Sequence, residues 1–227
     1  MHFIFKIKTL TSLCLGMMLA ACGSADDDYS NQQQISNAVE LSILHINDHH
    51  SHLDEEEWTF EFENAGSVEQ YTVLRGGFAR VTGLINELAA GKMNVLKMHS
   101  GDAITGDLYF NLTNGKADAD AMQTACFDSF VLGNHEFDNK DAGLRTFLDF
   151  FQNSTCENPM SILSSNVRFG ANSVLSNDNR IQPYQLFERG GETFAVIGLT
   201  VANKTKNSSQ PDADTVFEDE LITAQDQ

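Results

Sequence analysis

Short apolar runs alternate with helical patterns along most of the chain. Runs rich in β-branched and apolar residues predict strands at residues 41–46, 94–98, 129–132, 160–164 and 193–199. Apolar side chains recur at helical spacing over residues 78–90 and 139–151. Strands that alternate with helices are typical of an α/β fold, in which helices cover a largely parallel sheet.

Two segments interrupt this alternation. An Arg-Gly-Gly tripeptide at residues 189–191 separates the runs at 184–188 and 192–199, which is a hairpin signal and predicts one antiparallel edge. Residues 54–74 are acidic and aromatic, and we interpret them as a loop or a small excursion from the fold. The chain contains no evident internal repeat.

The first residues have the pattern of an export signal. Lys6 and Lys8 precede an apolar stretch, residues 9–21, that is too short to span a bilayer as a mature helix. A positively charged start followed by such a stretch is typical of a secretory signal. Residues 1–21 are therefore predicted to be a signal peptide rather than part of the fold.

The signal ends in Leu-Ala-Ala-Cys, which resembles the lipobox of bacterial lipoproteins. That resemblance implies that Cys22 carries the lipid, and the polar residues 22–39 suit a tether to the membrane. Gly23, rather than an aspartate, follows the cysteine. In a host with an outer membrane, the resemblance then favours anchoring in that membrane, facing the periplasm or the cell surface, over retention in the inner membrane. The alternative is an ordinary signal peptide with a chance cysteine.

Charge restricts the partners of the chain. Fourteen basic residues stand against 32 acidic ones, a formal net charge of −18. This composition excludes the basic footprint of a protein that binds a nucleic-acid duplex. It also repels phosphate esters at long range, so a phosphoester substrate would need local positive charge, for which metal ions are the obvious source.

Metal-binding residue types follow three successive predicted strands. Asp48 and His50 follow the first, Asp102 the second, and Asn134 and His135 the third. Open α/β sheets bind ligands at the carboxyl edge of their strands, so these side chains are expected to meet there. Carboxylates, imidazoles and amide oxygens are metal ligands, and one carboxylate can bridge two ions.

Local spacing supports this interpretation. In an extended chain, Asp48 and His50 would lie on the same side because alternate residues do. Gly101 and Gly133 would let the backbone turn sharply before the second and third ligand groups.

The stretch VLGNHEFD places Asp138 three residues after His135. A carboxylate at this distance can hydrogen-bond to the imidazole and favours its protonated form. Such a group could stabilise charge on a transferring phosphoryl group or assist the departure of the leaving oxygen. The alternative is a structural capping role for His135.

Six blocks together resemble one family, namely ILHINDHHSHL, GGFARV, HSGDAITGD, LGNHEFD, LSSNV and FAVIGLT. They are similar to the successive blocks of the 5′-nucleotidase family, within the dinuclear metallophosphoesterases. The resemblance implies two divalent ions, such as Zn or Mn, with Asp48 and His50 on one ion, Asp102 bridging, and Asn134 on the other. It also implies a catalytic dyad of His135 and Asp138.

The same resemblance implies a metallophosphoesterase-like sheet sandwich with flanking helices. Its substrates would be nucleotides or related esters, since relatives use 5′-nucleotides, cyclic nucleotides, nucleotide sugars and thiosulfonate esters. The implied reaction is an attack on phosphorus by a water activated between the two ions, in line with the leaving alcohol.

The chain departs from the family in its second half. The family completes its metal sites with a glutamine and further histidines, including a Gly-Gly-His block, but no histidine follows His135 here. We expect residues 40–227 to be an incomplete metallophosphoesterase domain, without the C-terminal nucleotide-binding domain, that binds metal weakly. Two functions stay open: an enzyme represented by its first part, or an inactive surface lipoprotein that only binds.

Export also changes the expected state of the cysteines. Cys14 would leave with the signal and Cys22 would be lipidated, so Cys126 and Cys156 remain to meet an oxidising compartment. Both cysteines are expected just before two adjacent strands begin, at the edge of the sheet opposite the site. Neighbouring strands lie about 4.8 Å apart, which is within the reach of a disulfide. We predict a disulfide between them, with two buried thiols as the alternative.

Overall fold

The computed structural model describes residues 38–152 and 154–227. Within these residues no helix is long and apolar enough to cross a membrane. Cys22, the predicted signal peptide and nearly all of the predicted tether lie outside the described residues.

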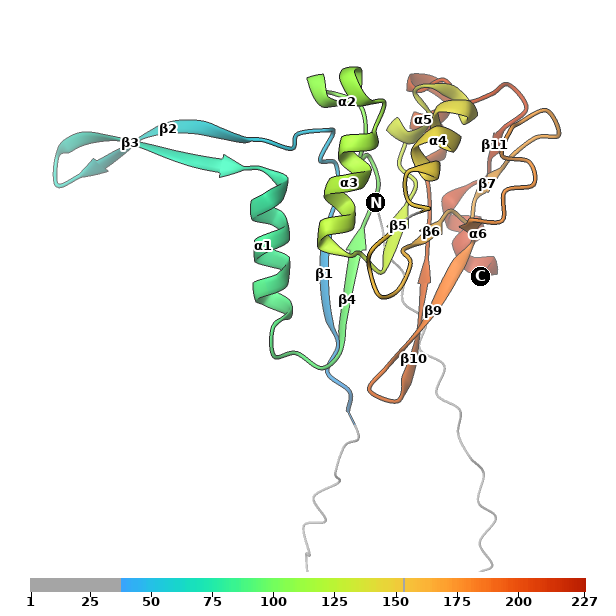
Figure 1. The fold of residues 1–227 in the computed structure, drawn as a ribbon, viewed down its shortest axis with the longest axis horizontal. Coiled ribbons are helices and arrows are strands. Elements are labelled where there is room, and N and C mark those ends of the chain that lie inside the picture. Colours follow the sequence, from blue (N-terminus) through green and yellow to red (C-terminus); the bar gives the residue numbers. More distant parts are fainter. Residues whose placement is uncertain (1–37, 153) are drawn as a thin grey trace, which may run out of the picture.

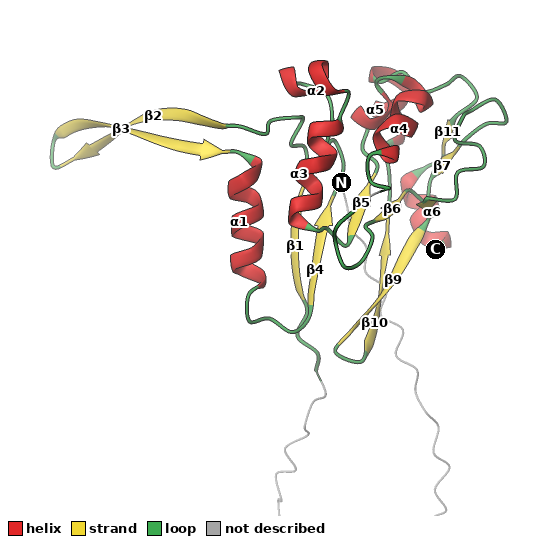
Figure 2. Cartoon of the chain, in the orientation of Figure 1, coloured by secondary structure: helices red, strands yellow, loops and turns green. Residues whose placement is uncertain are grey.

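A five-stranded parallel sheet forms the centre of the fold (Figures 1 and 2). Its strands are, in spatial order, β1 (Ser42–Ile46), β4 (Val95–His99), β5 (Ser129–Val131), β6 (Ser161–Leu163) and β8 (Ile181–Gln182). The first four correspond to predicted strands. The fifth is too short to produce a periodic pattern, and the sequence did not predict it.

Helices cover one face of this sheet and a hairpin covers the other. The helices are α1 (Phe78–Ala89), α2 (Leu108–Thr113), α3 (Lys116–Ala125), α4 (Lys140–Asp149), α5 (Ala202–Ser208) and α6 (Glu220–Asp226), with the 3₁₀ turn η1 (His135–Phe137). The larger core cluster joins α1, α3 and α4 to the sheet through buried residues such as Ile85, Met122, Phe147 and Phe130. The α/β fold predicted from the sequence is confirmed.

The covering hairpin consists of β9 (Tyr184–Arg189) and β10 (Glu192–Ile197), which pair antiparallel as predicted. The prediction that they form an edge of the central sheet was wrong, because they make a separate two-stranded sheet. Phe187 and Phe194 lie opposite each other and pack with Val196 on the second core cluster, formed by Leu96, Met98, Val131 and Leu163. A separate short ladder joins β7 (Val167–Arg168) to β11 (Val216–Phe217). The middle strands β5 and β6 are therefore buried on both faces, which explains their continuous apolar runs, whereas β1 alternates between half-buried and exposed residues.

Of the two interpretations of residues 54–74, a loop or a small excursion from the fold, the loop was wrong. This segment forms β2 (Glu55–Asn64) and β3 (Ser67–Gly76), a long antiparallel hairpin that extends away from the body of the molecule (Figure 1). Trp58, Phe60 and Phe62 alternate with polar residues, which is a strand pattern despite the acidity. Ala65 and Gly66, both at positive φ, form the two-residue turn.

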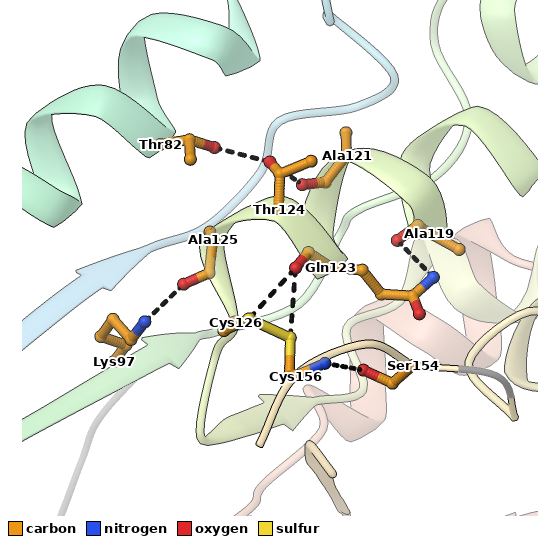
Figure 3. Close-up of a disulfide and its surroundings, with 10 residues drawn as sticks. All are labelled: Thr82, Lys97, Ala119, Ala121, Gln123, Thr124, Ala125, Cys126, Ser154 and Cys156. Carbon is orange, nitrogen blue, oxygen red and sulfur yellow. Dashed lines mark hydrogen bonds between the residues drawn. A yellow bond between two sulfur atoms is a disulfide. The ribbon is translucent and has the colours of Figure 1, made fainter. Parts of the chain in front are cut away.

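Cys126 and Cys156 form a disulfide with a Cα–Cα distance of 5.6 Å. Cys126 directly follows α3 and precedes β5, and Cys156 precedes β6, so the bridge lies at the amino edge of the sheet. Figure 3 shows both sulfur atoms facing the Gln123 carbonyl oxygen. Closing a loop of this length, a sequence separation of 30, stabilises a fold by roughly 3 to 4 kcal/mol in the chain-entropy model.

Candidate metal centre

The predicted ligands meet at the carboxyl edge of the sheet because three loops pair with one another there. The amide of Asp48 donates to the Gly101 carbonyl over 2.9 Å, and the amide of His50 donates to the Asp102 carbonyl over 3.2 Å. The amide of His135 donates to Oδ1 of Asp102 over 2.9 Å. The loop after β4 therefore joins the loops after β1 and β5.

A turn, and not strand alternation, brings Asp48 and His50 together. Strand β1 ends at Ile46, and the two residues have left-handed backbones with φ of 54° and 47°. Their side chains approach to 3.5 Å between Oδ1 of Asp48 and Nε2 of His50. The expected proximity is present, but the argument from an extended chain was wrong.

Gly101 and Gly133 allow the loops after β4 and β5 to approach each other closely, in addition to allowing sharp turns. Gly101 has φ of 95°, as the predicted sharp turn requires, and a Cβ there would lie 2.6 Å from the backbone nitrogen of Gly133. Gly133 has no positive φ, but a Cβ there would lie 2.2 Å from Oδ1 of Asp102. A side chain at Gly133 would thus collide with the carboxylate of Asp102, which the loop after β4 positions in the site.

Three side chains offer ligand atoms within 4.8 Å of one another, namely His50, Asp102 and His135. Asp48 extends this group through His50. The amide of Asn134, oriented with its nitrogen toward the carboxylate, reaches Oδ2 of Asp102 over 3.3 Å. Two carboxylates, an amide and imidazoles form a donor set that suits divalent transition metals. The residues present therefore fit a metal centre.

The two carboxylates of the centre differ in their electrostatics. Burial raises the pKa of Asp102 above its ordinary value. Burial acts in the same direction on Asp48, but the hydrogen bond from Asn47 and the charge of His50 outweigh it and lower the pKa of Asp48. Asp102 is the carboxylate that is shielded from solvent, with an exposed fraction of 8%.

His135 and Asp138 form the predicted pair. Nδ1 of His135 lies 2.7 Å from Oδ2 of Asp138, and the Thr105 hydroxyl donates to the same carboxylate oxygen over 3.1 Å. Nε2 of His135 is on the side of the metal centre, 3.2 Å from the amide oxygen of Asn134 in the orientation described above. The ring lies edge-on to that of His50 with centroids 4.6 Å apart. Thr105 was not among the predicted site residues, since an isolated threonine carries no sequence signal.

Glu136 is a second residue that sequence reasoning missed. Its carboxylate is fully buried and accepts the amide N–H groups of Asp102, Ala103 and Gly133 over 3.0, 2.8 and 2.6 Å. Burial, and then the charge of Asp102, raise the pKa of Glu136 to about 8, against the opposing effect of the three N–H donors. Glu136 thus ties the loop after β4 to the loop after β5.

The fold and this site define a metallophosphoesterase domain. The chain belongs to the calcineurin-like phosphoesterase family, whose sequence pattern it matches over residues 41–225.

Comparisons with individual proteins agree. The chain is 45% identical over 192 residues to the NAD 5′-nucleotidase of Haemophilus influenzae, covering 85% of this chain and 30% of that protein. It is 39% identical over 214 residues to a probable 5′-nucleotidase of Treponema pallidum, covering 94% of this chain and 33% of that protein. The chain spans about a third of the length of these relatives.

Solved structures show the same relationship. The H. influenzae NAD nucleotidase superposes with a TM-score of 0.72, over 82% of this chain and 31% of that one, at 45% identity. A 5′-nucleotidase precursor from Thermus thermophilus superposes with a TM-score of 0.67, over 82% of this chain and 33% of that one, at 31% identity.

Proposed function

We propose that this domain takes part in the metal-dependent hydrolysis of nucleotide phosphoesters, in the manner of a 5′-nucleotidase. The observation that carries the proposal is the convergence of Asp48, His50, Asp102 and Asn134 beside the His135–Asp138 pair. The names of the relatives support a nucleotide, including NAD, as the substrate.

Asp48, His50, Asp102 and Asn134 would hold two divalent ions, such as Zn or Mn, with Asp102 placed between the other ligands. The ions would supply an activated water and neutralise the charge of the phosphoryl group. The chain's own contribution is to position those ligands and to present Nε2 of His135 toward the same space. Asp138 accepts a hydrogen bond from protonated Nδ1 of His135 and favours the doubly protonated ring. The second proton, on Nε2, can then interact with a phosphoryl oxygen or the leaving group.

Hydrolysis of AMP, NAD and bis(p-nitrophenyl) phosphate with added Mn²⁺ or Zn²⁺ tests the proposal. The 227-residue chain should hydrolyse them weakly, and a form that carries the family's further histidine ligands should hydrolyse at least one of them strongly. EDTA should abolish both activities, because the ligands act only through the ions. Hydrolysis that chelation leaves unchanged would contradict the proposal.

A second candidate is a lipoprotein that binds a ligand without hydrolysing it. Metal-independent binding of a nucleotide, measured by calorimetry with no turnover in either form of the protein, would support this candidate over the hydrolase.

For localisation we propose export and anchoring through lipid on Cys22, on the basis of the signal-like start and the Leu-Ala-Ala-Cys sequence. Replacing Cys22 by serine should release the protein from membranes and leave its precursor uncleaved, because the lipid-bearing thiol is absent. Metabolic labelling with a clickable palmitate, followed by membrane fractionation, measures both effects. A wild-type protein that takes up no label would contradict the lipid anchor.

A further inference from the structure

A buried polar chain lies behind the metal centre and takes no part in the chemistry proposed above. It begins at Asp118 on α3, whose Oδ1 lies 3.1 Å from Nε2 of His49. Nδ1 of His49 lies 2.9 Å from Nε2 of His99, and the amide of Gly101 donates to Nδ1 of His99 over 3.2 Å. Oδ2 of Asp118 accepts the hydroxyl of Ser51 over 3.0 Å. We call this set the Asp118 network.

The network is buried among apolar side chains. Asp118, His99 and Ser51 are fully buried, and the side chain of His49 is 8% exposed. Phe78 packs edge-on against His49, and two further phenylalanines pack against His99. Polar groups in such a place persist only when hydrogen bonds satisfy them, so each proton of the network has a defined position.

The backbone donor at one end determines the direction of the hydrogen bonds. The amide of Gly101 can only donate, so Nδ1 of His99 must accept and its ring proton must be on Nε2. His99 then donates to Nδ1 of His49, whose own proton must be on Nε2, from where it reaches Asp118. Both rings are therefore neutral Nε2–H tautomers, and the Asp118 carboxylate accepts at the end of the chain.

The network forms hydrogen bonds to the two loops that carry the ligands Asp48, His50 and Asp102. His49 and Ser51 alternate with Asp48 and His50, and three of these four residues have left-handed backbones, Asp48, His50 and Ser51. Non-glycine residues adopt that conformation at a cost in free energy, so surrounding contacts must hold them there. At its other end the network holds Gly101, the residue before Asp102.

We propose that Asp118, His49 and His99 are positioning residues of the metal centre, which hold the Asp48–His50 turn and the Gly101–Asp102 turn at the distance that metal binding needs. The inference rests on the proposed metal centre. Asp118 lies far from the ligands in the sequence and touches none of them, so its effect on metal would pass through His49 and Ser51.

Co²⁺ binding to the 227-residue chain tests this role, because the absorption bands of Co²⁺ report both affinity and coordination geometry. Asp118→Ala should weaken Co²⁺ binding by about 10- to 100-fold and change the spectrum, the usual effect of removing an outer partner of metal ligands. Asp118→Asn should bind within a few-fold of the wild type. Its carbonyl oxygen still accepts from His49, and its amide can donate to Ser51.

Asp120→Ala is the matched control, since Asp120 lies on the same helix, is exposed and pairs with the exposed Lys116. It should leave Co²⁺ binding unchanged. Wild-type affinity in Asp118→Ala, or equal losses in the alanine and asparagine variants, would overturn the positioning role. A wild-type chain that shows no Co²⁺ bands would instead overturn the metal centre, and with it the proposed function.

A measurement on the wild type keeps the inference testable if Asp118→Ala does not fold. Two-bond ¹H–¹⁵N NMR correlations distinguish the tautomers of each histidine ring. His49 and His99 should both appear as neutral Nε2–H tautomers at neutral pH. An Nδ1–H tautomer or a charged ring at either position would overturn the network.

Discussion

Replacing His135 by alanine should lower the turnover of an active form of the protein by about 100-fold or more, the scale of losing a positioned acid or charge-stabilising group. The reason is geometric. Asp138 and Thr105 hold one side of the ring, so Nε2 is directed to the space that Asp102 and His50 also face. Phosphate release under saturating nucleotide measures the effect.

The position of His135 permits two roles, action on the phosphoryl group and metal ligation. The metal content of the variant distinguishes between them. If His135 acts on the phosphoryl group, elemental analysis should find the same metal content in His135→Ala as in the wild type. A parallel loss of metal would make His135 a ligand, and unchanged turnover would contradict the dyad. His52→Ala is the control, because His52 is 64% exposed, pairs with Asp107 and lies outside the metal cluster, so turnover should change little.

Replacing Glu136 by alanine should destabilise the chain by about 3 kcal/mol or more. The substitution removes the acceptor of three buried N–H groups, and each unpaired buried donor costs about 1–3 kcal/mol. Water that enters the cavity left by the Glu136 side chain would satisfy some of these N–H groups. The expected loss of stability therefore lies at the lower end of the summed cost of three unpaired donors. Urea unfolding with the disulfide intact measures it.

Glu87→Ala is a suitable comparison, because Glu87 is exposed on α1 and exposed substitutions of this kind change stability by about 0.5 kcal/mol or less. A loss below about 1 kcal/mol for Glu136→Ala would show that other groups or water satisfy the three amides. A Co²⁺ titration of Glu136→Ala should show weaker metal binding, since Glu136 sets the distance between the loops that carry Asp102 and Asn134.

Local patterns were sufficient for much of the fold. The runs at β4, β5 and β6 predicted strands because strands covered on both faces need apolar residues at nearly every position. The run at β1 predicted a strand although its residues alternate between half-buried and exposed. The pattern failed at α3, since its buried face consists of alanines, Met122 and the carboxylate of Asp118. It failed at β2 and β3 because the acidity of the segment obscures the alternation of Trp58, Phe60 and Phe62 in β2, and β3 alternates less regularly.

The sequence by itself determined which chemistry the site can hold. Asp48, His50, Asp102, Asn134 and His135 stand at the ends of successive strands, and parallel strands necessarily bring such ends to one edge. The pairing of Cys126 with Cys156 followed from the same reasoning at the opposite edge, because their strands are neighbours.

Only the tertiary structure decided how those residues are held. The left-handed turn at Asp48 and His50, the buried carboxylate of Glu136 and the contact of Asp118 with His49 depend on groups that the fold brings together from separate segments. Periodicity in a sequence reports which side of one element is buried. It cannot report which polar group of another element contacts that side. Packing between the two elements determines this contact, and the contact produces no periodic pattern in the sequence of either element.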